Sequence, residues 1–120
     1  MDTPDTAHKV ATVDRYVEAF EKKSLDRIRE IFADTAIVED PVRTDPHRGL
    51  EAVCELYRNG FASGAWLELL GRPRCAGNSV AFPFQVIVGE MKIEVIDVFE
   101  FDGSGKVVAM KAYWGPENLV

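Results

Sequence analysis

The organising stretch of this sequence is Ile93-Glu94-Val95-Ile96-Asp97-Val98-Phe99-Glu100-Phe101, a run rich in β-branched and aromatic residues, followed by the turn signal Asp102-Gly103-Ser104-Gly105. It predicts a strand, along which side chains alternate between two faces. Asp97 then shares an apolar face with Val95 and Phe99, where a carboxyl group must be paired or neutral. Two interpretations stay open: a structural aspartate that caps a loop or pairs with an arginine, or a functional carboxyl that lines an apolar cavity.

The second half of the chain predicts further strands on both sides of this one. They cover residues 65–70, 80–88 and 106–114 beside the strand at 91–101. Gly89-Glu90 and residues 102–105 have the composition of hairpin turns. Pro83 has no amide hydrogen to donate, so we expect an edge or a bulge where it interrupts its strand.

The first half of the chain predicts helices. Apolar residues recur at helical spacing at about residues 6–22, 25–33 and 50–59. Ser24 is a plausible N-cap for the second helix, which Asp34 ends. A short strand at 36–40 stops at Pro41, and a surface loop leads from there to the third helix. Three helices followed by antiparallel strands predict an α+β domain in which a curved sheet wraps around the helices.

Length and composition narrow the class of protein. A chain of 120 residues fits one domain that buries roughly two thirds of its unfolded surface. The net charge of −6, without a cluster of Lys or Arg, argues against nucleic acid and anionic membranes as partners. No apolar stretch approaches spanning length, and the polar first residues fit neither a signal nor a transit peptide, so we expect a cytoplasmic protein. Cys54 and Cys75 are interpreted as reduced core residues.

Most familiar catalytic signatures are absent from the sequence. It has no Gly-rich phosphate loop, no G-x-S-x-G elbow and no pair of histidines at metal spacing, so we expect neither a cofactor nor a metal. What remains is a set of polar groups on apolar faces: Tyr16, Asp40, Tyr57 and Asp97. Each alone is typical of a structural residue. Together, directed into one hollow, they would supply a base and hydrogen-bond donors for proton transfer beside a carbonyl group.

Six short motifs point to one protein family. In chain order they are Asp14-Arg15-Tyr16, Val38-Glu39-Asp40-Pro41, Leu56-Tyr57-Arg58-Asn59-Gly60, Phe82-Pro83-Phe84, Val95-Ile96-Asp97-Val98 and Ala112-Tyr113-Trp114. Their order and approximate spacing resemble the bacterial steroid delta-isomerase (ketosteroid isomerase) family over almost the whole chain. The resemblance implies a single isomerase domain over residues 1–120. It also implies the NTF2-like fold, a conical α+β barrel with three N-terminal helices packed in a curved, mostly antiparallel sheet, and a homodimer that binds a small apolar steroid.

The resemblance also implies roles for individual residues. Asp40 would be the general base that moves a proton from C4 to C6 of a 3-oxo-5-ene steroid through a dienolate. Tyr16 and Asp97 would donate hydrogen bonds to the 3-oxygen, and a neutral acid at this position is a known property of the family. Tyr57 would hydrogen-bond Tyr16, and Trp114 would lie near the base. These roles would account for a carboxyl on the apolar face of a strand.

The sequence departs from the family pattern at one position. The residues that form the wall of the pocket are a separate prediction. Phe32 stands where some members have a further tyrosine, so we expect a shorter hydroxyl network. The candidates for the wall of a steroid pocket are large apolar residues, each of which could instead be ordinary core: Phe82, Phe84, Phe99, Met110 and Trp114.

Two other functions compete with the isomerase. One is a protein of the same fold that holds a hydrophobic ligand without converting it. The other is a relative that performs dehydration or opens an epoxide, since a fold does not fix a function. A dehydratase would more naturally use a His-Asp pair, and neither His8 nor His47 is predicted on an apolar face.

Overall fold

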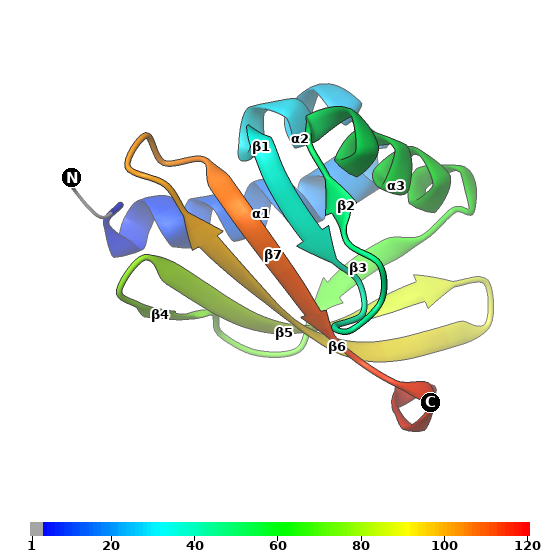
Figure 1. The fold of residues 1–120 in the computed structure, drawn as a ribbon. Coiled ribbons are helices and arrows are strands. Elements are labelled where there is room, and N and C mark those ends of the chain that lie inside the picture. Colours follow the sequence, from blue (N-terminus) through cyan, green and yellow to red (C-terminus); the bar gives the residue numbers. More distant parts are fainter. Residues whose placement is uncertain (1–3) are drawn as a thin grey trace.

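The computed structural model describes residues 4–120, which form three α-helices and a seven-stranded mixed sheet (Figure 1). The helices are α1 (Thr6–Lys22), α2 (Leu25–Ile31) and α3 (Leu50–Ala62). The strands are β1 (Phe32–Glu39), β2 (His47–Arg48), β3 (Trp66–Leu69), β4 (Arg74–Ala76), β5 (Ser79–Val88), β6 (Met91–Phe101) and β7 (Val107–Tyr113). A short 3₁₀ helix, η1 (Pro116–Asn118), follows the last strand.

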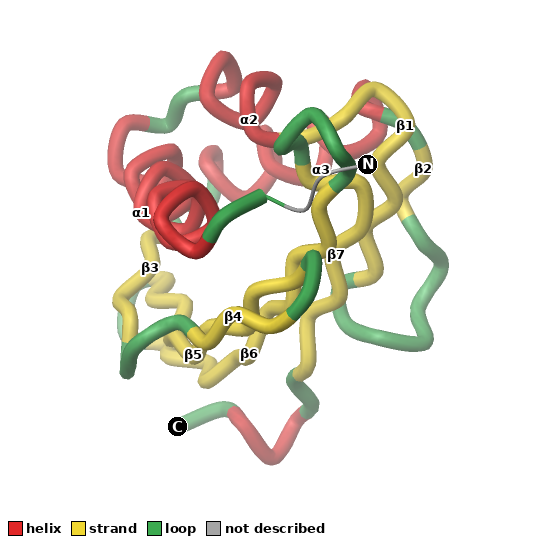
Figure 2. Tube along the Cα trace, turned by 90° about the vertical axis from the view of Figure 1, so that its left-hand side faces the viewer, coloured by secondary structure: helices red, strands yellow, loops and turns green. Residues whose placement is uncertain are grey.

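The sheet has the strand order β2-β1-β7-β6-β5-β3, and β4 also pairs with β5. Every pairing is antiparallel except the parallel one between β1 and β7. Figure 2 shows the sheet bending around α1, which is seen nearly end-on. The predicted α+β class, with three helices packed in a curved and mostly antiparallel sheet, is therefore confirmed. The sheet is not closed into a complete barrel.

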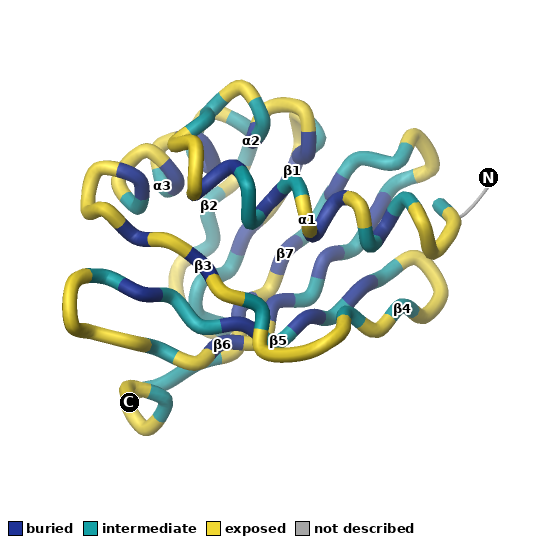
Figure 3. Tube along the Cα trace, turned by 180° about the vertical axis from the view of Figure 1, so that it is seen from behind, coloured by how far each residue is buried: buried dark blue, intermediate teal, exposed yellow. Residues whose placement is uncertain are grey.

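Alternation along β6 agrees with the prediction from the sequence. Val95, Asp97, Phe99 and Phe101 are buried on the face that the helices cover, whereas Glu94 on the other face is exposed. The same alternation appears in Figure 3 as buried positions that recur along the strands. Because β6 pairs with β5 along its whole length and with β7 over its second half, Asp97 lies in the middle of the sheet rather than at an edge.

The boundaries of α1 and α2 follow from their caps. The Asp5 side chain accepts a hydrogen bond from the backbone N–H of His8, and the Ser24 hydroxyl accepts one from Arg27. The second helix ends at Ile31, earlier than predicted, because the chain turns extended at Phe32 and joins the sheet as β1. The predicted strand at 36–40 is therefore the second half of a longer one.

Short elements and helix ends account for the other differences. The segment 41–49, predicted as a loop, contains the two-residue strand β2, which pairs with β1. The third helix extends to Ala62, beyond the predicted end. Pro83 causes no register shift with β6, and it lies between the residues of β5 that pair with β3 and those that pair with β4. Pro83 therefore lies at a gap on one edge of β5, as one of the two expectations had it. The other expectation, a β-bulge at this proline, does not agree with the regular pairing.

Within residues 4–120, no helix combines the length and the apolar character needed to cross a membrane.

Candidate active site

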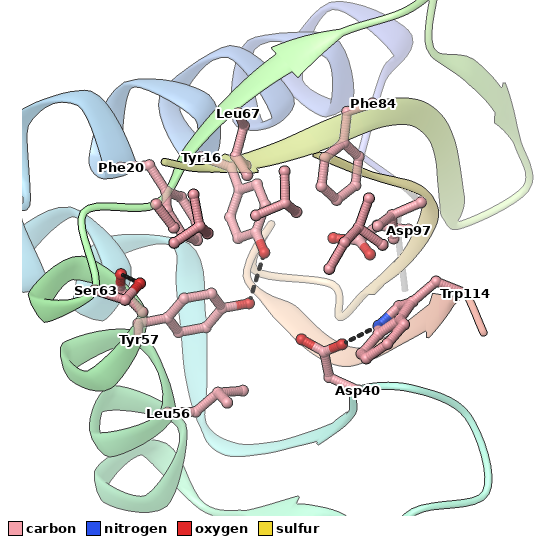
Figure 4. A pocket seen from close by; sticks show the side chains of 16 residues that line it. Tyr16, Phe20, Asp40, Leu56, Tyr57, Ser63, Leu67, Phe84, Asp97 and Trp114 are labelled. Carbon is pink, nitrogen blue, oxygen red and sulfur yellow. Dashed lines mark hydrogen bonds between the residues drawn. The ribbon is translucent and has the colours of Figure 1, made fainter. Parts of the chain in front are cut away.

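A cavity of about 240 Å³ lies between the helices and the inner face of the sheet. Its wall is mostly apolar and comes from α1, α3 and strands β3, β5 and β6: Phe20, Leu56, Ala65, Leu67, Phe84, Val86, Val88, Ile93 and Val95. Four polar side chains predicted from the sequence open into the same cavity: Tyr16, Asp40, Tyr57 and Asp97. Figure 4 shows these groups around one hollow, with Trp114 beside Asp40. The structure thus brings together residues that are far apart in the chain, with 98 positions between Tyr16 and Trp114.

Tyr16 and Tyr57 form a pair of buried hydroxyl groups. Tyr16 lies on the inner face of α1, and its hydroxyl oxygen is 2.9 Å from that of Tyr57 on α3. The ring of Phe99 packs edge-on against Tyr16, with ring centroids 5.1 Å apart, and so limits the positions that the hydroxyl can take. Either hydroxyl can be the donor. The two hydroxyl groups have two hydrogens, and the bond between them uses one. The other hydrogen can be donated to an acceptor in the cavity.

Both hydroxyl groups keep their protons at neutral pH. Burial, followed by the neighbouring Tyr57 and Asp97, raises the pKa of Tyr16 well above its ordinary value of 10.0. Burial and then Asp97 raise the pKa of Tyr57 in the same direction. Desolvation disfavours the charged phenolate more than the neutral phenol. The tyrosine pair is therefore a hydrogen-bond donor.

Asp97 is the least satisfied polar side chain at the cavity. It is only 1 % exposed, and within residues 4–120 neither of its carboxyl oxygens has a hydrogen-bond partner. Burial, followed by the negative charge of Asp40, raises the pKa of Asp97 well above its ordinary value of 3.8. The nearby Tyr16 hydroxyl acts in the opposite direction and is the smallest of the three influences. A carboxyl group in this environment holds its proton and can donate it to an acceptor in the cavity.

Asp40 occupies a different environment at the end of β1. Its side chain is partly exposed, and its Oδ1 accepts a hydrogen bond from Trp114 Nε1 at 2.7 Å. The parallel pairing of β1 with β7 explains the contact, because Glu39 lies opposite Lys111 and both strands end at the same edge. The indole N–H donates to the carboxyl oxygen and so holds the orientation of the side chain. Asp40 therefore presents a partly exposed, hydrogen-bonded carboxyl group to the same cavity that the buried and unpartnered Asp97 lines.

The structure places the predicted substrate-binding residues in two environments, the cavity lining and the core behind it. Of the predicted substrate-binding residues, Tyr57, Phe84 and Trp114 line the cavity. The remaining three do not line it: Phe82, Phe99 and Met110. These three are at most 1 % exposed and form core behind the site, where Phe82 and Phe99 pack against Tyr16. Their burial is a property of the core and not of the cavity wall.

Several cavity residues were missed by the sequence interpretation although their spacing could have found them. Leu56, Gly60 and Ser63 follow each other at i, i+4 and i+7, and so extend along one side of α3 and its end. Val86 and Val88 share a strand face with Phe84, as the period of two requires. Other residues on the same helix and strand faces pack into the core. Spacing alone therefore does not show which residues of a face line the cavity.

Other candidate groups lie outside this site. Within the described chain, no three or more His, Cys, Asp and Glu side chains are arranged to hold a metal ion. His8 is partly buried: its Nε2 lies 2.8 Å from the carbonyl oxygen of Gly105, and its ring contacts Phe101. Phe32 packs against the ring of Tyr57 with centroids 5.7 Å apart, so the hydroxyl network has no tyrosine at that position.

The chain is similar to known proteins over most of its length. The SnoaL-like domain family matches residues 13–110. The steroid Delta-isomerase of Nocardioides simplex is 37 % identical over 121 aligned positions that cover 96 % of each chain. The ECF RNA polymerase sigma factor SigG of Mycobacterium tuberculosis is 30 % identical over 76 % of this chain, which corresponds to 28 % of that protein.

A solved structure supports the same assignment. The epoxide hydrolase/cyclase-like enzyme SalBIII, described with a role in pyran ring formation in the polyether salinomycin, superposes with a TM-score of 0.85. It is 26 % identical, and the match covers 96 % of both chains. The chain described here therefore belongs to the SnoaL-like domain family and has the NTF2-like fold.

Proposed function

We propose that this protein is a steroid delta-isomerase, which converts 3-oxo-5-ene steroids to the conjugated 4-ene isomers. One observation carries the proposal: the partly exposed carboxylate of Asp40 faces the same apolar cavity as two buried acids, Tyr16 and Asp97, that keep their protons. The similarity to a steroid Delta-isomerase over 96 % of the chain gives independent support. The proposal treats residues 1–120 as one catalytic domain that uses neither a metal nor a cofactor.

The proposed reaction is an intramolecular proton transfer. Asp40 removes a proton from C4 of the steroid, and the electron pair of the broken C–H bond moves into a dienolate whose negative charge lies on the 3-oxygen. Tyr16 and Asp97 donate hydrogen bonds to that oxygen, so the charge develops against fixed donors on the wall of a mostly apolar cavity. Asp40 then returns the proton to C6, which leaves the double bond conjugated with the ketone.

The roles of Trp114 and Tyr57 follow from their contacts. Trp114 Nε1 donates to Asp40, so it orients the base between C4 and C6. Tyr57 can donate to the Tyr16 oxygen, which leaves the Tyr16 hydrogen for the ligand. Both are positioning residues in this proposal, and neither takes the transferred proton.

An absorbance assay tests the proposal. The purified protein is mixed with a 3-oxo-5-ene steroid, and formation of the conjugated enone is followed in the ultraviolet. A proton transfer catalysed by the protein should give a rise in absorbance that is proportional to protein concentration and absent in Asp40→Asn. A protein that binds the steroid without changing the absorbance would be a ligand carrier, and the isomerase assignment would be withdrawn.

A second candidate function is favoured by the likeness to SalBIII. A carboxylate base and a neutral carboxyl acid on one cavity could also open an epoxide, with Asp97 protonating the epoxide oxygen while Asp40 activates the nucleophile. The two candidate functions differ in the bond that breaks: a C–H bond of the steroid in the isomerisation, and a C–O bond in the opening of an epoxide. Hydrolysis or cyclisation of an epoxide without enone formation would favour this second function.

The proposal includes a homodimer in the cytoplasm. Ile96 and Tyr113 are cross-strand neighbours on the outer face of the sheet, and each is 49 % exposed, which is high for large apolar residues in strands. A second copy packed on this face would cover them. Light scattering of wild type and of Ile96→Glu tests this, because the charged variant should be a monomer if the face is the interface.

A further inference from the structure

The cavity has a polar end and an apolar end. The hydroxyl groups of Tyr16 and Tyr57 point toward the side of the cavity where Asp40, Asp97 and Trp114 lie (Figure 4). Among the described residues that line the rest of the cavity, Ser63 is the one that has a polar side chain. Figure 4 shows Ser63 on the side of the cavity away from Asp40, Asp97 and Trp114. The proposed proton transfer gives no role to the hydroxyl group of Ser63.

The position of Ser63 is set by the end of α3. It is the C-cap residue, with φ −73° and ψ −12°, and its backbone N–H donates to the carbonyl of Asn59. It follows Tyr57 by six residues, which corresponds to about 9 Å along a helix axis at 1.5 Å per residue. Ser63 is exposed whereas Tyr57 is buried, so Ser63 lies where the cavity meets solvent.

The hydrogen of the Ser63 hydroxyl is already used. Its Oγ donates to the carbonyl oxygen of Gly60 at 2.6 Å. A hydroxyl group has one hydrogen and two lone pairs, so Ser63 offers an acceptor to anything that enters the cavity. A ligand carbonyl would need that same hydrogen and would have to break the bond to Gly60. A ligand hydroxyl can donate to Oγ while the existing bond is kept.

Gly60 leaves room for such a contact. It lies within α3, where a glycine is less favourable than an alanine. A Cβ at this position would lie 3.7 Å from Cε2 of Phe20, which is ordinary contact, so packing does not forbid a side chain. The bare backbone keeps that volume open next to Ser63, on the lining of the cavity.

We propose that Ser63 is a specificity-determining residue, which accepts a hydrogen bond from a hydroxyl group at the end of the steroid remote from the 3-oxo group. This inference rests on the proposed function, because the 3-oxygen must lie at Tyr16 and Asp97 for the remote ring to reach Ser63. A rigid tetracyclic ligand anchored there extends along the apolar wall toward the mouth. The protein then prefers a substrate with a remote hydroxyl to the same substrate with a remote ketone.

The test uses two 3-oxo-5-ene steroids that differ only at the remote ring, one with a hydroxyl and one with a ketone. For wild type, kcat/KM should be about 2- to 10-fold higher for the hydroxyl substrate, as expected for one net hydrogen bond of 0.5–1.5 kcal/mol. Ser63→Ala should bring the ratio close to one by lowering kcat/KM for the hydroxyl substrate. Ser63→Thr keeps the acceptor and should restore the preference. Ser79→Ala, at the far end of β5 and outside the cavity lining, is the matched control.

Equilibrium binding separates this inference from the proposed function. The probes are two saturated 3-oxo steroids with the same remote hydroxyl or ketone, which cannot isomerise. If wild type shows no isomerisation but prefers the hydroxyl ligand through Ser63, the isomerase proposal fails and the specificity site stands. If wild type isomerises both substrates and Ser63→Ala leaves the ratios of kcat/KM and of affinity unchanged, the role of Ser63 is overturned and the isomerase proposal stands.

Discussion

Two carboxyl groups reach one cavity from two regions of the sheet that surround them differently. Asp97 comes from the centre of β6, is 1 % exposed and has an elevated pKa. Asp40 comes from the end of β1, is partly exposed and accepts a hydrogen bond from Trp114. The same functional group is thereby buried without a partner in one place and is hydrogen-bonded and partly open to solvent in the other. In the proposed function, this difference in position within the sheet, rather than residue type, distinguishes the acid from the base.

The largest expected effect comes from removing the base. Asp40→Asn keeps the size of the side chain but takes no proton, so we expect kcat to fall by about 10² to 10⁴-fold or more while steroid affinity is largely kept. Steady-state kinetics and binding of a saturated 3-oxo steroid measure the two quantities. Glu39→Gln, one residue earlier, is the control and should keep its activity. Retention of more than about a tenth of kcat would remove Asp40 from the role of base.

Loss of the direct oxyanion donor should be next in size. Tyr16→Phe should lower kcat by roughly 10² to 10³-fold, as is typical for one oxyanion donor, with a smaller effect on ground-state binding. Tyr57→Phe should lower kcat less, because Tyr57 acts through Tyr16. Tyr113→Phe changes an exposed tyrosine outside the cavity lining and serves as the control. If Tyr57→Phe had the larger effect, Tyr57 would be the direct donor and the two roles would be exchanged.

Two substitutions of Asp97 separate hydrogen-bond donation from packing. Asn has a donor of similar size, whereas Leu fills the space without one. We expect Asp97→Asn to lose about tenfold in kcat and Asp97→Leu to lose roughly 10² to 10³-fold, near the cost of a missing oxyanion donor. Circular dichroism of both variants checks that the fold is kept. Equal activity of the two variants would mean that donation from residue 97 does not contribute.

A kinetic effect as small as that of Asp97→Asn is expected at Trp114, which donates a hydrogen bond to Asp40. Trp114→Phe keeps an aromatic ring in the cavity and removes the N–H that donates to Asp40. We expect kcat to fall by about tenfold, since a hydrogen bond to a charged group contributes about 1.5 kcal/mol or more. KM should change little, because the ring still lines the cavity. A fall confined to steroid affinity would show that Trp114 is a wall residue and does not position Asp40.

The sequence predicted which faces of the helices and strands are buried, but it predicted only some of the residues that line the cavity. Alternation along residues 93–101 placed Asp97 on the inner face, and helical spacing placed Tyr16 near the apolar side of α1, because both signals are local. Large apolar side chains were proposed for the pocket wall, but two of them, Phe82 and Phe99, lie in the core and do not line the cavity. A residue on an inner face can meet the cavity or a neighbouring side chain, and only the packing of distant segments decides which.

The shortest strands and the long-range contacts could not be predicted from local sequence patterns either. β2 and β4 have two and three residues, too few for a periodic pattern, and they form because β1 and β5 offer unpaired backbone groups beside them. The contact between Asp40 and Trp114 depends on the parallel pairing of β1 with β7. That contact was suggested by the family resemblance and not by either residue's own surroundings in the sequence.

The pH dependence of stability tests the central difference between the two carboxyl groups most directly. An aspartate that is protonated when folded, but titrates near pH 3.9 when unfolded, makes the native state the greater proton binder between those two pKa values. Its contribution to stability is therefore complete below about pH 3.9 and declines as pH rises, by about 1.4 kcal/mol per pH unit, until the elevated pKa of the folded state is passed. Asp97→Asn has no such proton to lose.

The measurement is the free energy of unfolding by urea for wild type and Asp97→Asn between pH 5 and pH 8. Glu94→Gln, on the exposed face of the same strand, is the control and should run parallel to wild type. Because burial and Asp40 raise the pKa of Asp97 well above 3.8, the stability difference should shift in favour of Asp97→Asn as pH rises. Parallel curves for wild type and Asp97→Asn across this range would mean that Asp97 is already ionised in the folded protein, which would contradict its role as a neutral donor.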